Sequence, residues 1–146
     1  MSWRVLEQEN MELAEFGRAR LAGRPAYLAT VRQDGSPRVH PVTPIVGDGH
    51  LFIFMEPTSP KGHDLQRDGR YALHSSVEDT GGGGGEFLIT GQGHLIDDVK
   101  LRAVAVQYAA YAPKERYILF EMTIETAFST TYDSDGTPIR KRWKRE

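Results

Sequence analysis

The chain contains no cysteine among its 146 residues. This absence excludes disulfide bonds, thiolate catalysis and iron–sulfur clusters, and it removes the ligands of most structural zinc sites. The five histidines are scattered, with no HxH or HxxxH spacing, so we expect no metal site either. Any redox chemistry would therefore depend on an organic cofactor.

The chain also has little net charge and no long hydrophobic run. A formal net charge of -2 gives no global basic field that would attract nucleic acid or an anionic membrane. No stretch approaches the roughly 18 apolar residues of a membrane span. The first residues, MSWRVLEQENMELAEF, are acidic and amphipathic, unlike a signal peptide. We expect one cytoplasmic domain over residues 1–146, with neither nucleic-acid nor membrane partners.

Short segments of alternating polarity, separated by turn residues, occupy the middle of the chain. Helices are expected after the cap Asn10 up to Gly23, and at 60–67 and 100–112. Strands are expected at 26–32, 37–46, 50–55, 71–77, 86–97 and 116–132, with a bulge at the glycines of the fifth. The short connections favour a mainly β fold, an antiparallel sheet that closes into a barrel with flanking helices.

The segment Thr58-Ser59-Pro60-Lys61-Gly62 is the most informative candidate site. Ser59 is a good N-cap and Pro60 a good first helical residue. A helix N-terminus offers free backbone N–H groups and a partial positive charge, to which Lys61 adds a full charge. This combination suits a phosphate monoester. An ordinary capped helix with a solvated lysine would produce the same pattern.

The run LATVRQDGSPRVHPVTPIVGDGHLFIFMEPTSPKGHDLQRDGRYALH, residues 28–74, resembles the pyridoxamine 5'-phosphate oxidase-like family of FMN-binding split barrels. The shared features are a D-G turn, a proline strand start, an aromatic-rich strand and an S-x-K segment before "D-L-x-x-D-x-R-x-A-L". The later segment GEFLITGQGHLIDD resembles the next strand of that family. The similarity covers roughly residues 26–126. The remainder is the N-terminal helix and a basic C-terminal tail.

The resemblance implies FMN, or its deazaflavin relative F420, bound at a homodimer interface. By position, the family's cofactor contacts fall on three groups of residues. His40, Pro41, Val42 and Thr43 would line the ring, Phe54 and Met55 would flank the ribityl chain, and Ser59 and Lys61 would hold the phosphate. Glu86 occupies a position where the oxidase branch has a glutamine contributed by the partner subunit.

Two departures argue against pyridoxamine phosphate as the substrate. Pro60 stands where the oxidase branch has an arginine, and the C-terminal R-L-H motif of those enzymes is absent. We therefore expect an FMN-dependent oxidoreductase with an unidentified small-molecule substrate and no catalytic side chain.

Three other possibilities stay open. The first is an F420-dependent reductase, with Arg38, Arg67 and Arg70 lining a basic groove for the longer anionic tail. The second is a non-catalytic flavin- or haem-binding carrier or sensor, in which His40 or His63 would ligate haem. The third is a ligand-free interaction domain. The basic tail would be solvated, touch RNA or a phosphate-bearing ligand, or fold over the partner's cofactor with Trp143 near the ring.

Overall fold

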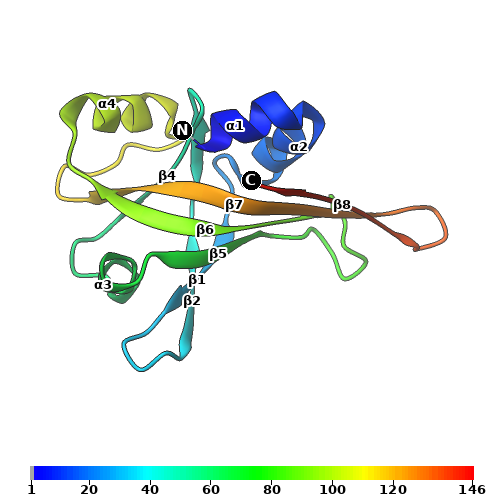
Figure 1. Ribbon diagram of the computed structural model, residues 1–146, viewed down its shortest axis with the longest axis horizontal. Coiled ribbons are helices and arrows are strands. Elements are labelled where there is room, and N and C mark those ends of the chain that lie inside the picture. The colour runs from blue at the N-terminus through cyan, green and yellow to red at the C-terminus, as the bar shows by residue number, and fades with distance from the viewer. Residues whose placement is uncertain (1) are drawn as a thin grey trace.

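The computed structural model describes residues 2–146, which form four helices and eight strands (Figure 1). The helices are α1 (Ser2–Glu9), α2 (Met11–Leu21), α3 (Pro60–Arg67) and α4 (Val99–Tyr108). The strands are β1 (Ala26–Val31), β2 (Pro37–Val42), β3 (Ile45–Gly47), β4 (His50–Met55), β5 (Arg70–Ser75), β6 (Glu86–Ile96), β7 (Ile118–Tyr132) and β8 (Pro138–Lys144). No helix in this range is both long and apolar enough to cross a bilayer.

The strands form one antiparallel sheet in the order β2-β1-β5-β6-β7-β4-β3, and β8 also pairs with β7. The first half of β7 pairs with β4 and the second half with β8, so this 15-residue strand joins two parts of the sheet. β2 and β3 lie at opposite ends of the strand order although only two residues separate them. The sheet must therefore curl without closing, which is the expected split barrel.

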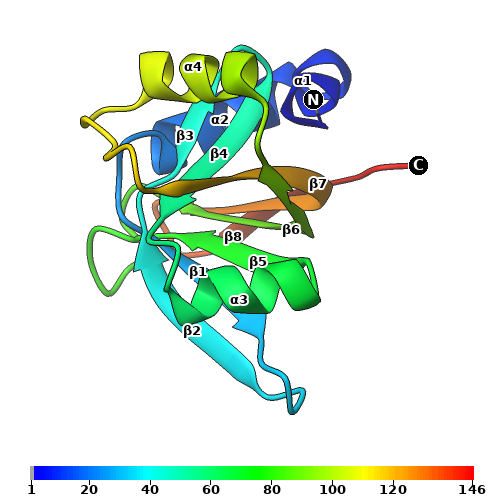
Figure 2. The ribbon, with the colours of Figure 1, turned by 90° about the vertical axis from the view of Figure 1, so that its left-hand side faces the viewer.

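The helices cover the sheet unequally. Figures 1 and 2 show α1, α2 and α4 on one side of β6 and β7, with α3 on the other side beside β1 and β2. Local signals set the helix starts. The side chain of Asn10 accepts a hydrogen bond from the Leu13 N–H (3.1 Å), and Asp98 caps α4 in the same way. α3 begins and ends at the predicted residues.

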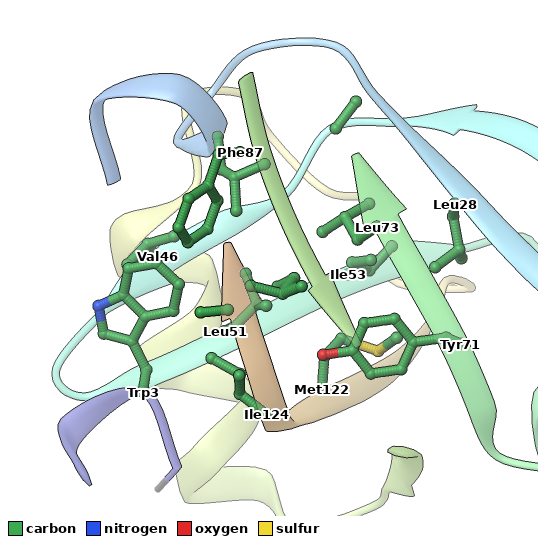
Figure 3. Close-up of a cluster of buried hydrophobic side chains, with 14 of the residues drawn as sticks. Trp3, Leu28, Val46, Leu51, Ile53, Tyr71, Leu73, Phe87, Met122 and Ile124 are labelled. Atoms are coloured by element: carbon green, nitrogen blue, oxygen red, sulfur yellow. The ribbon is translucent and has the colours of Figure 1, made fainter. Parts of the chain in front are cut away.

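The main core fills the inside of the curled sheet. Figure 3 shows side chains from the N-terminal helix and several strands converging there, among them Trp3, Leu51, Phe87 and Ile124. Trp3 and Phe87 meet edge to face, with ring centroids 6.3 Å apart. A second cluster lies under α4 and includes Phe52, Phe54 and Leu119. β4 is buried on both faces because its alternate residues enter these two clusters.

One expectation about the strands was wrong. The segment expected as one strand at 37–46 breaks at Thr43-Pro44 into β2 and β3, since Pro44 has no N–H to continue a ladder. As a result the hairpin partner of β4 is β3, while β2 pairs with β1 alone among the described residues.

The two ends of the chain also differ from expectation. The basic tail, expected to be solvated, forms β8 along β7. Trp143 is buried, and its indole Nε1–H donates to Glu9 Oε1 (2.9 Å), so it cannot stack on a partner's cofactor in this arrangement. α1 was not anticipated, and the helix expected over 100–112 ends at Tyr108.

Candidate functional site

The first turn of α3 follows the Glu56–Ser59 turn that leaves β4. Ser59 is the N-cap, with extended backbone, and its Oγ accepts a hydrogen bond from the Gly62 N–H (3.2 Å). Pro60 occupies the first helical position, where a missing N–H costs nothing. The N–H groups of Gly62 and His63 donate to Ser59, so the amide of Lys61 and the helix dipole are what would favour an anion at this end.

Lys61 is buried in this turn. Only 8% of the residue is exposed, and its ammonium group has no hydrogen bond or ion pair within residues 2–146. Burial lowers the pKa of Lys61 from its ordinary value of 10.5. The side chain is thus mostly enclosed, although its ammonium nitrogen is not among the fully buried polar atoms. An anionic ligand would offset the partial loss of water around this charge.

Met55, at the end of β4, packs against the same turn. A Cβ atom added at Gly62 would lie 3.1 Å from Met55 Sδ and 3.0 Å from Ser59 Oγ, so the glycine permits this close approach. Phe54 leaves β4 on the opposite face, where it packs under α4 with the Arg102 guanidinium 5.0 Å from its ring centroid. The side chains of Phe54 and Met55 therefore cannot both flank one ribityl chain, and Met55 is the one beside α3.

β2 presents the residues expected to line a ring. His40 and Arg38 lie on the same face of the strand, since they are two residues apart, while Pro41 lies on the other face. His40 is exposed, and its Nδ1 donates to the Pro41 carbonyl oxygen (2.8 Å), which leaves Nε2 free to accept a hydrogen bond or ligate. Val42 is buried, and Thr43 is half-buried at the bend before β3.

An ion network joins β2 to α3. Arg38 Nε donates to Asp64 Oδ2 (2.7 Å), the Thr30 hydroxyl donates to the same oxygen (2.8 Å), and Arg67 Nη2 donates to Asp64 Oδ1 (3.1 Å). Burial alone would raise the pKa of Asp64, but the hydrogen bonds from Arg38, Thr30 and Arg67 outweigh it and lower that pKa. Asp64 is therefore a buried carboxylate that holds two arginines side by side.

A cavity of about 580 Å³ opens next to this network. It lies between α3 and the loop that joins β1 to β2, which Figure 2 shows projecting beyond the helix. Its lining is mainly polar and basic: Arg32, Gln33, Asp34, Arg38, Pro60, His63, Asp64 and Arg67. Arg70, expected in the same groove, is not part of it and pairs instead with Asp68 (2.7 Å).

Glu86 lies far from this region. Glu86 is the first residue of β6, whereas α3 packs against Gly93 of the same strand. At the usual rise per residue, Glu86 and Gly93 are about 23 Å apart along the strand. The Tyr132 hydroxyl donates to Glu86 Oε2 (2.5 Å), which raises the pKa of Tyr132. His74 Nε2 lies 3.8 Å from the other carboxylate oxygen. These three residues line a separate cavity of about 560 Å³ beside the glycine-rich loop.

One chain thus brings Met55, Ser59 and Lys61 together at the first turn of α3, with His40 on β2 two residues from Arg38, and it leaves Phe54 and Glu86 elsewhere. Sequence reasoning missed Asp64 and Thr30. A signal for Asp64 was present, since it lies three residues after Lys61 and so shares its helix face.

Comparison with known proteins places these features in context. The model of a family described as pyridoxamine 5'-phosphate oxidase matches residues 13–131. No curated protein matches the sequence.

Several solved structures share the fold. They include a haem-binding protein from Mycobacterium smegmatis (18% identical, TM-score 0.68, 89% of this chain and 57% of that chain covered). PhzG from Burkholderia lata, solved with tetrahydrophenazine-1-carboxylic acid, is 19% identical (TM-score 0.67, 100% and 88% covered). HutZ, a haem storage protein from Vibrio cholerae, is 15% identical (TM-score 0.59, 80% and 89% covered). The chain thus spans little more than half the length of the first of these proteins.

Proposed function

Because this chain belongs to the pyridoxamine 5'-phosphate oxidase-like split-barrel family, we propose that it binds FMN and acts as an oxidoreductase on a small-molecule substrate. The observation that carries the proposal is Lys61 in the first turn of α3, a mostly buried lysine whose ammonium group has no hydrogen bond or ion pair within residues 2–146. FMN brings a phosphate that would supply the missing negative charge. Once bound, a flavin exchanges hydride with a substrate at N5, so the protein's task is to bind and position.

The residues around α3 fit this cofactor. Lys61, through its ammonium group and its backbone amide, and the Ser59 hydroxyl would hold the phosphate. Met55 would lie against the chain between phosphate and ring, and the strand from His40 to Thr43 would border the ring. Pro60, in place of the arginine of the oxidase branch, argues for a substrate other than pyridoxamine phosphate. A cytoplasmic location is part of the same proposal.

We further propose that the working form is a homodimer. The sheet face opposite the core carries large exposed apolar side chains on β1, β2 and β7, namely Tyr27, Val39, Phe128 and Tyr132. Registered pairs run across this face from Pro41 through Tyr27, His74, Leu88 and Phe128 to Arg142. Several large exposed apolar side chains on one face are typical of a protein–protein interface. A second copy on this face would also allow Glu86 to contact the cofactor of the partner subunit.

Titration with FMN, followed by quenching of flavin fluorescence, tests the cofactor assignment. Lys61→Ala should weaken FMN binding by about 10- to 100-fold, the usual effect of losing a charge-assisted hydrogen bond. Lys100→Ala is the matched control, since Lys100 is the second residue of α4 but is exposed. Equal affinities for the two variants would exclude Lys61 as the phosphate ligand, and no FMN binding by the parent protein would exclude the proposed function.

Haem binding is a second candidate, favoured by one observation. His40 is exposed, and its Nδ1–H is held by a backbone carbonyl, so its Nε2 is available as a ligand. Two of the similar structures are described as haem-binding and haem storage proteins. On this alternative, addition of haemin should give a Soret band that His40→Ala shifts or removes and His63→Ala does not. A spectrum unchanged from free haemin would reject it.

A further inference from the structure

The cavity beside the glycine-rich loop differs in chemistry from the region around Lys61. It has a volume of about 560 Å³ and lies where β6 begins and β7 ends. Its lining includes His74, Asp79, Glu86 and Tyr132, but neither a lysine nor an arginine. When His74 is neutral, this lining carries two negative charges, so the cavity favours a cationic ligand over an anionic one.

Glu86 is the carboxylate in this cavity that has an oxygen available for a ligand. The Tyr132 hydroxyl donates to its Oε2 (2.5 Å) and thereby orients the carboxylate. Its Oε1 accepts no hydrogen bond in the described chain. Asp79 is engaged differently, since its Oδ1 accepts from the backbone N–H groups of Gly81 and Gly83 (both 2.9 Å) and so shapes the loop.

His74 presents a second acceptor to the same space. Its Nδ1–H donates to the Ser75 carbonyl oxygen (2.6 Å), because a carbonyl oxygen can only accept. In the neutral ring Nε2 is then an acceptor, and it lies 3.8 Å from Glu86 Oε1, too far for a hydrogen bond. A single donor group between these two acceptors would satisfy both. The nitrogen of a primary ammonium group, about 3 Å from each atom, would donate to both.

The walls of the cavity are held in place and are partly apolar. Gly82 lies against the Tyr132 ring, since a Cβ atom there would be 2.5 Å from Tyr132 Cε2. Arg20 holds the base of the loop, where its Nη2 donates to the Ser76 carbonyl oxygen (2.8 Å). The exposed Tyr132 ring and Val77 offer apolar surface to the organic part of a ligand, and a tyrosine ring also attracts a cation to its face.

We propose that this cavity binds a small molecule through a primary ammonium group, which donates to Glu86 Oε1 and His74 Nε2 while its organic part lies against Tyr132. The inference goes beyond the proposed function and does not require a flavin. Arg140 lies in the same register row as Glu86, two strands away, and is not part of the lining. The protein would thus hold an anionic group at α3 and a cationic group beside the glycine-rich loop.

Titrations of the purified protein with three matched probes, followed by NMR chemical shifts, test this site. The first probe is 2-phenylethylamine. The second is its trimethylammonium analogue, which keeps the charge but has no N–H donor, and the third is 2-phenylethanol, which has no charge. We expect saturable binding of the amine and binding of the other two that is weaker by about 10-fold or more, because only the amine combines a charge with N–H donors.

Substitutions in the lining locate the binding. Glu86→Gln should weaken binding of the amine by about 10-fold or more, the usual effect of losing a charge-assisted hydrogen bond. His74→Phe should weaken it by less, since it removes a neutral acceptor, and should leave binding of the trimethylammonium analogue unchanged. Asp135→Asn is the matched control, because Asp135 is exposed in the turn after β7 and does not line the cavity.

Three outcomes would overturn the proposal. The amine and its trimethylammonium analogue would bind equally, the Glu86→Gln variant would bind the amine as tightly as Asp135→Asn, or the parent protein would show no saturable binding of the amine. The comparison of probes uses the parent protein alone, so it decides the matter even where a substitution impairs folding. Titration with FMN is a separate measurement, and failure of the ammonium site leaves the cofactor assignment standing.

Discussion

At the scale of single residues, two lysines in matching positions differ in what surrounds them. Lys61 and Lys100 are each the second residue of a helix capped by an oxygen-bearing side chain. Lys100 is exposed to water, whereas Lys61 is enclosed without a counter-charge in the described chain. The same residue type in the same helical position is therefore solvated at one helix end and mostly buried at the other, where an anion would compensate its charge.

The burial of Lys61 predicts how ligand binding depends on pH. The pKa of Lys61 is lower in the folded protein than its ordinary value of 10.5. At a pH between the folded-state pKa and 10.5 the unfolded chain binds more protons than the folded one, so the stability of the ligand-free protein rises with pH. A bound phosphate favours the charged lysine, so binding in this window should take up protons and weaken as pH rises. Calorimetric titration in two buffers of different ionisation enthalpy measures the uptake. Proton uptake that persists unchanged in Lys61→Ala would contradict the assignment.

Asp64 carries a separate prediction about stability. Asp64→Asn removes the charge that holds Arg38 and Arg67. We expect it to lower the free energy of unfolding by about 2 to 3 kcal/mol. This is less than for a fully buried ion pair, because both arginines are partly exposed. Because the folded-state pKa of Asp64 is lowered, its contribution is present above the ordinary value of 3.8 and disappears as pH falls through the folded-state pKa.

Denaturant unfolding at neutral and acidic pH checks this expectation. Asp68→Asn is a suitable control, since Asp68 pairs with the exposed Arg70 and should contribute much less than Asp64. The network would be unimportant for stability if both variants unfolded at the denaturant concentration of the parent protein.

At the scale of helices and strands, some local signals were read correctly and others were missed. The cap Ser59, Pro60 and the stop at Asp68 mark the two ends of α3, so this helix could be placed from sequence. The break of the strand expected at 37–46 was also signalled locally, by Pro44, and was missed.

In the candidate site, too, residues adjacent in sequence were easier to predict than distant ones. Ser59 and Lys61 could be named because the helix start, the cap and the charge lie next to one another in the sequence. The contact between Arg38 and Asp64 joins residues 26 positions apart, and only the curl of the sheet reveals it. Phe54 and Met55 were assigned to one ligand by position in the chain, although adjacent strand residues point to opposite faces.

The bulge in β6 gives a prediction at this scale. A Cβ atom at Gly91 would lie 1.9 Å from the Thr123 carbonyl oxygen, a backbone atom that cannot move aside alone. Gly91→Ala should therefore cost about 1 to 3 kcal/mol, as overpacking generally does. Gly81→Ala is the control, because its nearest contact would be a side-chain oxygen at 3.4 Å and its backbone is not in the left-handed region. Thermal unfolding of the two variants compares them, and equal melting temperatures would show that the bulge tolerates a side chain.

At the scale of the whole molecule, the exposed apolar side chains on one face of the sheet lead to the prediction of a dimer. Phe128 lies in the registered row of this face, between Leu88 and Arg142. Phe128→Glu should place a charge inside the proposed dimer interface and shift the protein towards monomer. Sedimentation velocity at micromolar concentration measures the shift. Val99→Glu serves as control, since Val99 is 81% exposed at the start of α4 and lies away from this face.

A parent protein that sediments as a monomer would contradict the dimer, and a Phe128→Glu variant that remains dimeric would contradict this face as its interface. In either case Glu86 could not reach a partner's cofactor across this face. Its hydrogen bond with Tyr132 would then belong to the separate cavity beside the glycine-rich loop.

The most direct test of the central claim compares FMN with riboflavin, which has the same ring but no phosphate. The purified protein is incubated with each in turn, desalted, and its absorption spectrum recorded. We expect flavin bands to be retained with FMN and largely lost with riboflavin, because the buried charge of Lys61 selects the phosphate. Equal retention of the two would show that the phosphate contributes nothing, and retention of neither would contradict flavin binding altogether.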